Sequence, residues 1–235
     1  MKLRSKILLP VGIVLIGLIA GMYHVSNSIL LQGFAHVEEN SMKVNVSRAA
    51  NALTQAVEEL TSKSADWGMW DDTCQFVNDR NEAFVKSNVS ALALRSIRVD
   101  GMVLYNKNLE PALDVMLDQG NEEELLQGRL HRILSSYPSL GVFKDHEDVH
   151  SGLLLTAMGP VMVVSRPILN SQGEGESHGT LLFIRKIGPQ TSSDIEKNIR
   201  LSTTIHRIGE MDFPGDFSDA LASISPQHPV LVTPV

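Results

Sequence analysis

The chain opens with a long apolar run that follows three basic residues, Lys2, Arg4 and Lys6. Residues 7–37 contain no Lys, Arg, Asp or Glu, and the first half of this run is almost purely aliphatic. An uncharged apolar stretch of about 20 residues is long enough to cross a bilayer as a helix. Basic residues before such a helix favour a cytoplasmic N-terminus. We therefore expect a transmembrane helix over residues 7–27.

Two other interpretations of this run stay open. A cleaved signal peptide needs a small-x-small cleavage site soon after its apolar core, and residues 19–24 form a poor one. A buried core helix of a soluble protein usually keeps a polar face. We expect a retained anchor in the inner (cell) membrane, crossed once, with residues 1–6 in the cytoplasm. Residues 28–235 then lie in the periplasm or outside the cell.

The anchor is expected to continue into a long stalk helix over residues 28–65. No proline occurs between Pro10 and Pro111, so nothing in this stretch is a strong helix breaker. Apolar side chains recur every three or four positions and form one stripe. Such a stripe packs on the domain behind it, on a second copy as a coiled coil, or on each at different heights. We expect a homodimer, with contacts through Met42, Val46, Leu53, Val57 and Leu60.

The remaining pattern alternates between helical and strand spacing. Predicted helices cover residues 81–97, 122–134 and 218–224, and Ser193 with Glu196 forms a capping-box pattern for another helix. Predicted strands cover residues 102–105, 111–117, 152–158, 161–169, 180–187 and 230–232. Short links, a turn at 106–108, a hairpin turn at 159–160 and a glycine-rich loop at 170–179, indicate antiparallel pairing. The pattern predicts an α/β (α+β) domain over residues 66–235, with an antiparallel sheet flanked by helices.

Composition narrows the function classes. The formal net charge is −7, and removing the three basic residues before the anchor leaves −10 on the exported part. An acidic surface gives no electrostatic reason to bind nucleic acid. The single cysteine, Cys74, permits no intrachain disulfide and is expected to be a small buried side chain.

Motifs for catalysis are missing from the sequence. It contains no Gly-x-Ser-x-Gly elbow, phosphate loop, dinucleotide fingerprint or His-Glu-x-x-His. His146 and His150 share one face only in a helix, and their place between glycines favours a solvated acidic loop over a metal site. We therefore expect no catalytic residue, no bound metal and no cofactor.

The best candidates for ligand binding are Asp66, Trp67, Trp70, Asp71 and Asp72. Both tryptophans of the chain fall within four residues of each other, beside three carboxylates. Indole faces next to carboxylates suit a cationic or amphipathic ligand. The alternative is structural, with the indoles in the core and the carboxylates capping helices or binding loop amides.

Arg166 is the sixth candidate. It lies inside the apolar strand 161–169, directly before Pro167. A charged side chain in an apolar strand should face a carboxylate, an anionic ligand or water. A structural ion pair with one of the carboxylates of residues 66–72 is the simplest expectation.

These residues also carry a family resemblance. The pattern Asp66-Trp67-Gly68-x-Trp70-Asp71-Asp72-Thr73-x-x-Phe76-Val77, followed by Asn81-x-x-Phe84, resembles the start of the fourth type of CHASE domain. A second matching block is Ser165-Arg166-Pro167-Ile168-Leu169, followed by Gly179-Thr180-Leu181-Leu182. CHASE domains are extracytoplasmic sensory domains of microbial cyclases and histidine kinases. The resemblance covers about residues 40–235, and Cys74 replaces the usual tyrosine of the family.

The resemblance implies a PAS-like or Cache-like fold and a sensory role with an unknown small-molecule ligand. Members usually continue with further strands, a second membrane helix and an output module, so we expect this chain to be truncated within the domain and to lack its own output. The first hypothesis is a membrane-anchored sensory domain in signal transduction. The alternative is an anchored binding or scaffold subunit that pairs with a complete receptor. A hydrolase using Asp71 and Asp72 is the third hypothesis and has no supporting nucleophile or metal frame.

Overall fold

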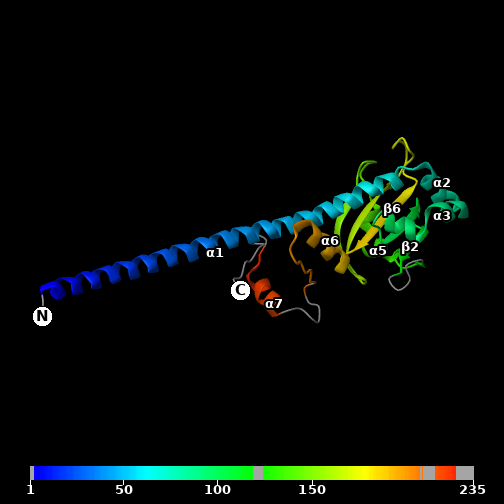
Figure 1. The fold of residues 1–235 in the computed structure, drawn as a ribbon. Coiled ribbons are helices and arrows are strands. Elements are labelled where there is room, and N and C mark those ends of the chain that lie inside the picture. Colours follow the sequence, from blue (N-terminus) through cyan, green and yellow to red (C-terminus); the bar gives the residue numbers. More distant parts are fainter. Residues whose placement is uncertain (1–2, 119–123, 207, 209–214, 226–235) are drawn as a thin grey trace. The chain divides into compact units, whose positions relative to one another are not determined.

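The computed structural model describes residues 3–118, 124–206, 208 and 215–225. The chain divides into two units, one of Met1–Arg48 with Pro214–Val235 and one of Ala49–Phe213. Helix α1 (Leu3–Gly68) contributes to both units (Figure 1). Each unit is described by itself below.

The first unit contains the apolar part of α1 and a short helix, α7 (Gly215–Ser223). Within α1, the segment Pro10–Leu30 is long and apolar enough to cross a membrane, with 21 residues and a mean hydropathy of 1.7. The predicted apolar helix is therefore present. Helix α7 matches the helix expected at 218–224, whereas the strand expected at 230–232 lies outside the described residues.

The second unit is built on one six-stranded sheet. Its strands are β1 (Gly101–Asn106), β2 (Pro111–Leu117), β3 (Leu125–Gln127), β4 (His150–Thr156), β5 (Gly159–Ile168) and β6 (Gly179–Lys186). The spatial order is β3-β2-β1-β6-β5-β4, and every neighbouring pair is antiparallel. The first and last strands of the sequence therefore meet at the centre of the sheet. This mixed helix and antiparallel-sheet architecture confirms the predicted fold class.

The helices cover the two faces of this sheet unequally. One face packs against α1 and three short helices, α2 (Asp71–Asp79), α3 (Glu82–Asn88) and α4 (Ala91–Ser96). We call it the α1 face, and its buried residues include Leu60, Phe76, Phe84, Met102, Leu104 and Phe183.

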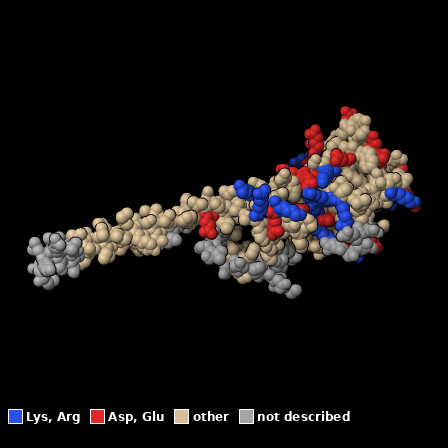
Figure 2. Space-filling view, in the orientation of Figure 1, with Lys and Arg blue, Asp and Glu red and all other residues tan. Residues whose placement is uncertain are grey.

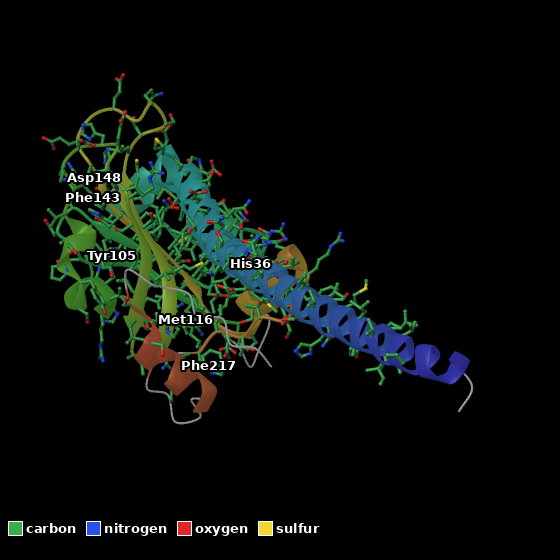
Figure 3. All side chains as sticks on the ribbon, turned by 90° about the vertical axis from the view of Figure 1, so that its left-hand side faces the viewer. His36, Tyr105, Met116, Phe143, Asp148 and Phe217 are labelled. Atoms are coloured by element: carbon green, nitrogen blue, oxygen red, sulfur yellow. The ribbon has the colours of Figure 1, made fainter. Side chains whose placement is uncertain are left out.

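The opposite face packs against α5 (Arg132–Ser136) and the 3-10 helix η1 (Pro138–Gly141), and we call it the α5 face. Its buried residues include Val103, Tyr105, Met116, Leu134, Leu140 and Leu182. Successive strand residues point to opposite faces, which is why Met102 and Leu104 join one cluster while Val103 and Tyr105 join the other. Figure 3 shows Tyr105 and Met116 on the side of the sheet away from α1.

The helix predicted over residues 81–97 is wrong as a single element, because the structure divides it into α3 and α4. Asn81 begins the first, since its side chain accepts a hydrogen bond from the Phe84 amide at 2.8 Å. Val89 is extended, with φ −108° and ψ 94°. Ser90 then caps α4 by accepting from the Ala93 amide at 3.0 Å. A serine N-cap is a strong start signal for a helix, and here it restarts the chain in a new direction.

The helix predicted over residues 122–134 is also wrong. Within the described part of this segment the chain forms strand β3 and then helix α5. Gly128 has φ +68°, a conformation that favours glycine and separates the two elements. The side chain of Leu130 then packs so close to Gly101 that a Cβ at Gly101 would lie 2.4 Å from the Leu130 Cδ1 atom. The helical spacing of leucines thus reflects tertiary packing of a strand and a turn.

Two element boundaries differ from the prediction. The β4–β5 hairpin turns at Ala157–Met158, and Pro160 lies inside β5 opposite Leu155. Helix α6 (Pro189–Ile199) begins four residues before the predicted cap at Ser193. Glu196 accepts hydrogen bonds from the Thr203 amide at 2.9 Å and the Ser202 hydroxyl at 3.2 Å, so it binds the segment after α6.

The apolar stripe of α1 has different surroundings along its length. Leu60 is completely buried, and Leu53 and Val57 pack against the core of the α1 face. Met42 and Val46 remain 43% and 42% exposed. Three of the five residues expected at a dimer contact are thus used by the chain's own domain.

Candidate ligand-binding site

The two tryptophans predicted to bind a ligand belong to an aromatic cluster on the α1 face. Their rings meet edge to face, with centroids 5.7 Å apart. Trp67 also contacts Phe84 and Phe183, and Phe84 in turn stacks on Phe76 at 4.5 Å. Edge-to-face and offset contacts of this kind stabilise a core. Both indoles therefore have a packing role, and binding of a ligand by them stays a prediction.

The carboxylates of Asp66, Asp71 and Asp72 have different surroundings in the structure. Asp71 accepts hydrogen bonds from the amide and hydroxyl of Ser171, at 2.9 and 2.7 Å. These bonds, the backbone one first, hold the pKa of the Asp71 carboxyl below its ordinary value. Asp66 and Asp72 are exposed. Asp72 lines a shallow cavity of about 360 Å³ between α2 and α3, and its ligand role also stays a prediction.

Arg166 is buried beneath the end of α1, with 6% of its surface exposed. Its Cδ lies so close to Gly68 that a Cβ there would be 2.6 Å away. No ion pair joins Arg166 to a carboxylate in the described parts of the chain, and its Nε atom has no hydrogen-bond partner there. Burial lowers the pKa of this guanidinium, and the charge of Asp66 opposes that shift. The expected ion pair is thus only a longer-range attraction.

A larger cavity of about 550 Å³ opens on the α5 face of the sheet. Its apolar lining includes Met116 and Ile133, which are 8% and 6% exposed, and Tyr137. The Tyr137 hydroxyl donates to the Leu155 carbonyl at 2.7 Å, so this ring is held across the mouth of the β4–β5 hairpin. The volume falls in the usual range of small-molecule pockets.

Three cationic side chains line this cavity, those of Arg129, Arg132 and Lys186. Asp114 positions the first two, because its carboxylate accepts from the amides of Leu130 and His131 at 2.9–3.1 Å. The same carboxylate contacts the His131 ring at 2.9 Å. Both carboxylate oxygens of Asp114 therefore already bind the segment of Leu130 and His131.

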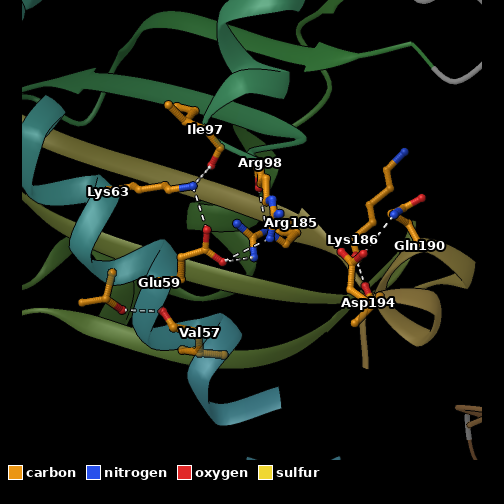
Figure 4. A network of polar contacts seen from close by, with 11 residues as sticks. Val57, Glu59, Lys63, Ile97, Arg98, Arg185, Lys186, Gln190 and Asp194 are labelled. Carbon is orange, nitrogen blue, oxygen red and sulfur yellow. Dashed lines mark hydrogen bonds and ion pairs between the residues drawn. The ribbon is translucent and has the colours of Figure 1, made fainter. Parts of the chain in front are cut away.

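Lys186 enters the cavity from the end of the central strand β6. Its neighbour in sequence, Arg185, points to the opposite face and reaches Glu59 on α1, with Nη1 3.5 Å from the carboxylate (Figure 4). Glu59 also binds Lys63 at 2.8 Å, and the Lys63 ammonium donates to the Ile97 carbonyl at 3.1 Å. A single strand end thus connects the cavity to a polar network on α1.

The Glu59 carboxyl is the common acceptor of that network. Burial alone would raise its pKa, but the hydrogen bond from Lys63 and the charges of Arg185, Lys63 and Arg98 together hold the pKa below its ordinary value. The backbone of Arg98 takes part as well, because its carbonyl accepts from Arg185 Nε at 2.5 Å. The space-filling view of Figure 2 shows Lys and Arg side chains gathered on the surface where Figure 1 places α6.

Another cavity of about 630 Å³ lies at the other end of the sheet, near Phe143 (Figure 3). Its lining includes exposed loop residues of both charges, and its Lys107 already pairs with Glu176 at 3.3 Å. The cavity on the α5 face is the better candidate, because its cations have no ion-pair partner in the part of the chain that the structure describes. Among the described residues, no group of three or more His, Cys, Asp or Glu side chains could hold a metal ion.

Sequence reasoning missed the residues of this cavity. Arg129, His131 and Arg132 lie within four positions in an acidic chain, and that local excess of cations was the available signal. The helix predicted over residues 122–134 concealed this signal. Arg129 and Arg132 line one cavity with Lys186 only because the chain turns between β3 and α5. Cys74 was predicted correctly, because it is 7% exposed and its thiol donates to the Leu169 carbonyl at 2.7 Å.

The sequence pattern of the CHASE4 domain matches residues 52–206, about two thirds of the chain. The chain belongs to the CHASE4 domain family. This match confirms the resemblance drawn from the blocks around Trp67 and Arg166. It covers the whole sheet and the cavity on its α5 face, so the CHASE4 domain of this chain is the part that holds the candidate site.

The chain is similar to one relative and to two solved structures. The Methanogenesis regulatory histidine kinase FilI of Methanothrix harundinacea is 25% identical over 190 residues, 80% of this chain and 21% of that protein. The chain therefore spans about a fifth of the relative's length. The extracellular domain of vpHK1S-Z8 is 12% identical, with a TM-score of 0.45 and coverage of 64% and 62% of the two chains.

The second structure is the ligand-binding domain of the Campylobacter jejuni chemoreceptor Tlp3, solved with L-valine. It is 15% identical, with a TM-score of 0.39 and coverage of 71% of this chain and 66% of that one.

Proposed function

We propose that this protein is the sensory input part of a membrane-anchored signalling protein. In this proposal residues 1–6 are cytoplasmic, residues 7–27 cross the inner membrane and residues 28–235 lie outside. A small molecule binds in the cavity on the α5 face, and helix α1 carries the response to the membrane. The output module, of the kinase class named for the relative FilI, lies outside residues 1–235, and this part of the protein is itself not an enzyme.

The observation that carries the proposal is the double role of strand β6. Lys186 lines the cavity on one face, while Arg185 contacts Glu59 of α1 on the other. Alternate side chains of a strand point to opposite faces, so a ligand that moves the end of β6 also moves the contact with α1. The Lys63–Ile97 hydrogen bond and the burial of Leu60 hold the same stretch of helix to the domain.

The energy required of such a link is modest. A ligand shifts an equilibrium between two arrangements only by its difference in affinity for them. Allosteric couplings are typically about 1–3 kcal/mol, which is of the order of one or two hydrogen bonds to charged groups. The contacts of the partly exposed Glu59, worth roughly 1 kcal/mol, lie at the lower end of this range.

The proposal includes a homodimer with contacts through Met42 and Val46. These two residues keep the helical spacing of the stripe and remain exposed. Leu53, Val57 and Leu60 are already packed against the domain, so they are left out of the contact proposed here. A short apolar stripe of this kind suits a two-helix contact.

A first experiment locates the ligand. The full chain in lipid nanodiscs is screened by thermal unfolding against a metabolite library, together with two variants that fill different cavities. Ala157→Trp fills the cavity on the α5 face, whereas Ala83→Trp fills the shallow cavity beside Asp72. We expect a stabilising compound whose effect is lost in Ala157→Trp and kept in Ala83→Trp. The reverse pattern moves the site to the residues around Asp72 and contradicts the proposal.

A second experiment tests transmission. Hydrogen exchange of the nanodisc-embedded full chain is measured with and without the compound found in the screen. We expect altered protection in residues 53–64 of α1, and no alteration for the same compound in Ala157→Trp. A compound that binds the cavity without changing exchange in α1 would show a binding protein that does not signal through this helix.

A further inference from the structure

We infer that the cavity on the α5 face selects a small organic anion, a carboxylate with an apolar body. This inference rests on the proposed function and specifies its ligand. It follows from three features of the cavity lining: unpartnered cations, a buried apolar floor and a shortage of free hydrogen-bonding groups.

The cations are the first feature. The side chains of Arg129, Arg132 and Lys186 make no hydrogen bond or ion pair with any described residue, and no Asp or Glu is among the residues that line the cavity. The chain as a whole is acidic, with 27 acidic and 20 basic residues, yet this cavity is lined by cations alone among charged side chains. Other cations of the domain do have partners, such as Arg185 with Glu59 and Lys86 with Glu82.

Three like charges around one hollow repel one another, and the repulsion grows as water is displaced from between them. An anion placed among them removes that repulsion and supplies charge-assisted hydrogen bonds. A neutral ligand would have to displace water from these cations and give nothing in return. The electrostatics of the cavity therefore favour one negative group within reach of these three side chains.

The apolar floor determines the rest of the ligand. Met116 and Ile133 are almost completely buried and face the hollow from the sheet and from α5. Two of the three side-chain hydroxyls in the lining are already used, since the Tyr137 hydroxyl donates to Leu155 and the Thr156 hydroxyl donates to Gly159 at 2.9 Å, and Ser136 supplies the third. A ligand body with many hydroxyl groups would lose its hydrogen bonds to water here. A hydrocarbon body gains about 25 cal/mol per Å² of its surface that is buried.

Lys186 connects this ligand class to the response. It is only partly exposed, and it directly follows Arg185, which is held by Glu59. An anion that draws the Lys186 ammonium into the cavity pulls on the strand end that carries the α1 contact. A neutral molecule of the same shape has no such effect on Lys186.

The test uses matched pairs of acids and amides. Binding to the full chain in nanodiscs of neutral lipid is measured by calorimetry for 4-methylpentanoate and 4-methylpentanamide, for benzoate and benzamide, and for inorganic phosphate. We expect at least one carboxylate to bind tenfold or more tightly than its amide, and to weaken as salt rises from 0.05 to 0.5 M because salt screens these partly exposed charges. Phosphate should bind more weakly, because it makes no use of the apolar floor.

Three variants identify the residues. Lys186→Met and Arg132→Gln should each weaken the carboxylate tenfold or more, while the control Lys86→Gln, which removes an exposed cation on α3, should leave its affinity unchanged. The thermal midpoints of the unliganded variants show that each still folds. If no carboxylate exceeds its amide, or if phosphate binds as well as the best acid, the inference is wrong.

The two proposals fail separately. An amide that binds as tightly as its acid, is excluded by Ala157→Trp and alters α1 exchange would overturn the anion class and leave the sensor proposal standing. A carboxylate that depends on Lys186 and Arg132 but leaves α1 exchange unchanged would keep the anion class and overturn the sensor proposal.

Discussion

The two faces of the sheet use the same strands for different purposes. On the α1 face, Trp67, Phe76, Phe84 and Phe183 interlock with a fully buried Leu60. On the α5 face, one short helix and one 3-10 turn cover the strands only partly and leave a cavity of about 550 Å³. Both faces bury apolar side chains, but only the first carries the aromatic cluster, and the second keeps volume that a ligand can occupy. Substitutions that break this contrast are therefore informative.

The largest effect is expected from Phe183→Ala on the α1 face. Phe183 is completely buried within the aromatic cluster, and truncation of such a side chain typically costs about 3–5 kcal/mol. Chemical unfolding of the full chain in detergent, followed by the fluorescence of Trp67 and Trp70, measures the change. The matched control on the edge strand is Leu155→Ala, since Leu155 is 52% exposed, and it should cost less than about 1 kcal/mol. Equal costs would show that burial within the aromatic cluster does not set the cost of truncation.

The next effect concerns the close approach of Arg166 to α1. Gly68→Ala places a Cβ 2.6 Å from Arg166 Cδ, and overpacking of this kind costs about 1–3 kcal/mol. In the Arg166→Ala background the new methyl group no longer meets the three Arg166 atoms nearest to it, so Gly68→Ala should cost at least about 1 kcal/mol less there. A double-mutant cycle by chemical unfolding measures the coupling. Additive effects would show that the two residues do not share this contact.

Glu59→Gln tests the connection between α1 and strand β6. The substitution removes the charge that Lys63 and Arg185 share, and because Glu59 is partly exposed the loss should be roughly 1 kcal/mol. The pKa of Glu59 is lowered in the folded state, so its contribution is present in full above the ordinary value of 4.5 and is lost as pH falls through the folded pKa. Stability measured between pH 7 and 3 should therefore fall less steeply in Glu59→Gln than in the parent chain. Parallel pH profiles would contradict this assignment.

The last and smallest predicted effect concerns the reactivity of the Cys74 thiol. Burial, with the nearby charge of Asp71, raises the pKa of the Cys74 thiol to about 11. At pH 8 the thiol is almost entirely protonated, and the thiolate is the reactive form. Mass spectrometry should find the native chain unlabelled by iodoacetamide when the urea-unfolded chain is fully labelled. In Leu155→Cys the added cysteine, at an exposed position of the edge strand β4, should be labelled in the native state.

Several features of this protein follow from the sequence alone. Apolar runs of strand length, separated by turn residues, are sufficient to place β1, β2, β5 and β6, because a buried strand requires such a run wherever it pairs. The uncharged N-terminal segment is equally direct, since no folded context is needed to make it apolar. The CHASE-type blocks around Trp67 and Arg166 identify the family, which the match over residues 52–206 confirms.

Tertiary structure decided the rest. The leucine spacing over residues 122–134 fits a helix, yet Gly128 and the bonds from Asp114 to Leu130 and His131 turn the chain at that point. That turn brings Arg129 and Arg132 to Lys186, which lies more than 50 positions away in the sequence. Local pattern has no information on such convergence, because it depends on strand order and on which face each residue takes. The sequence itself thus determined the elements and the family, and the packing of the sheet decided where a ligand site could form.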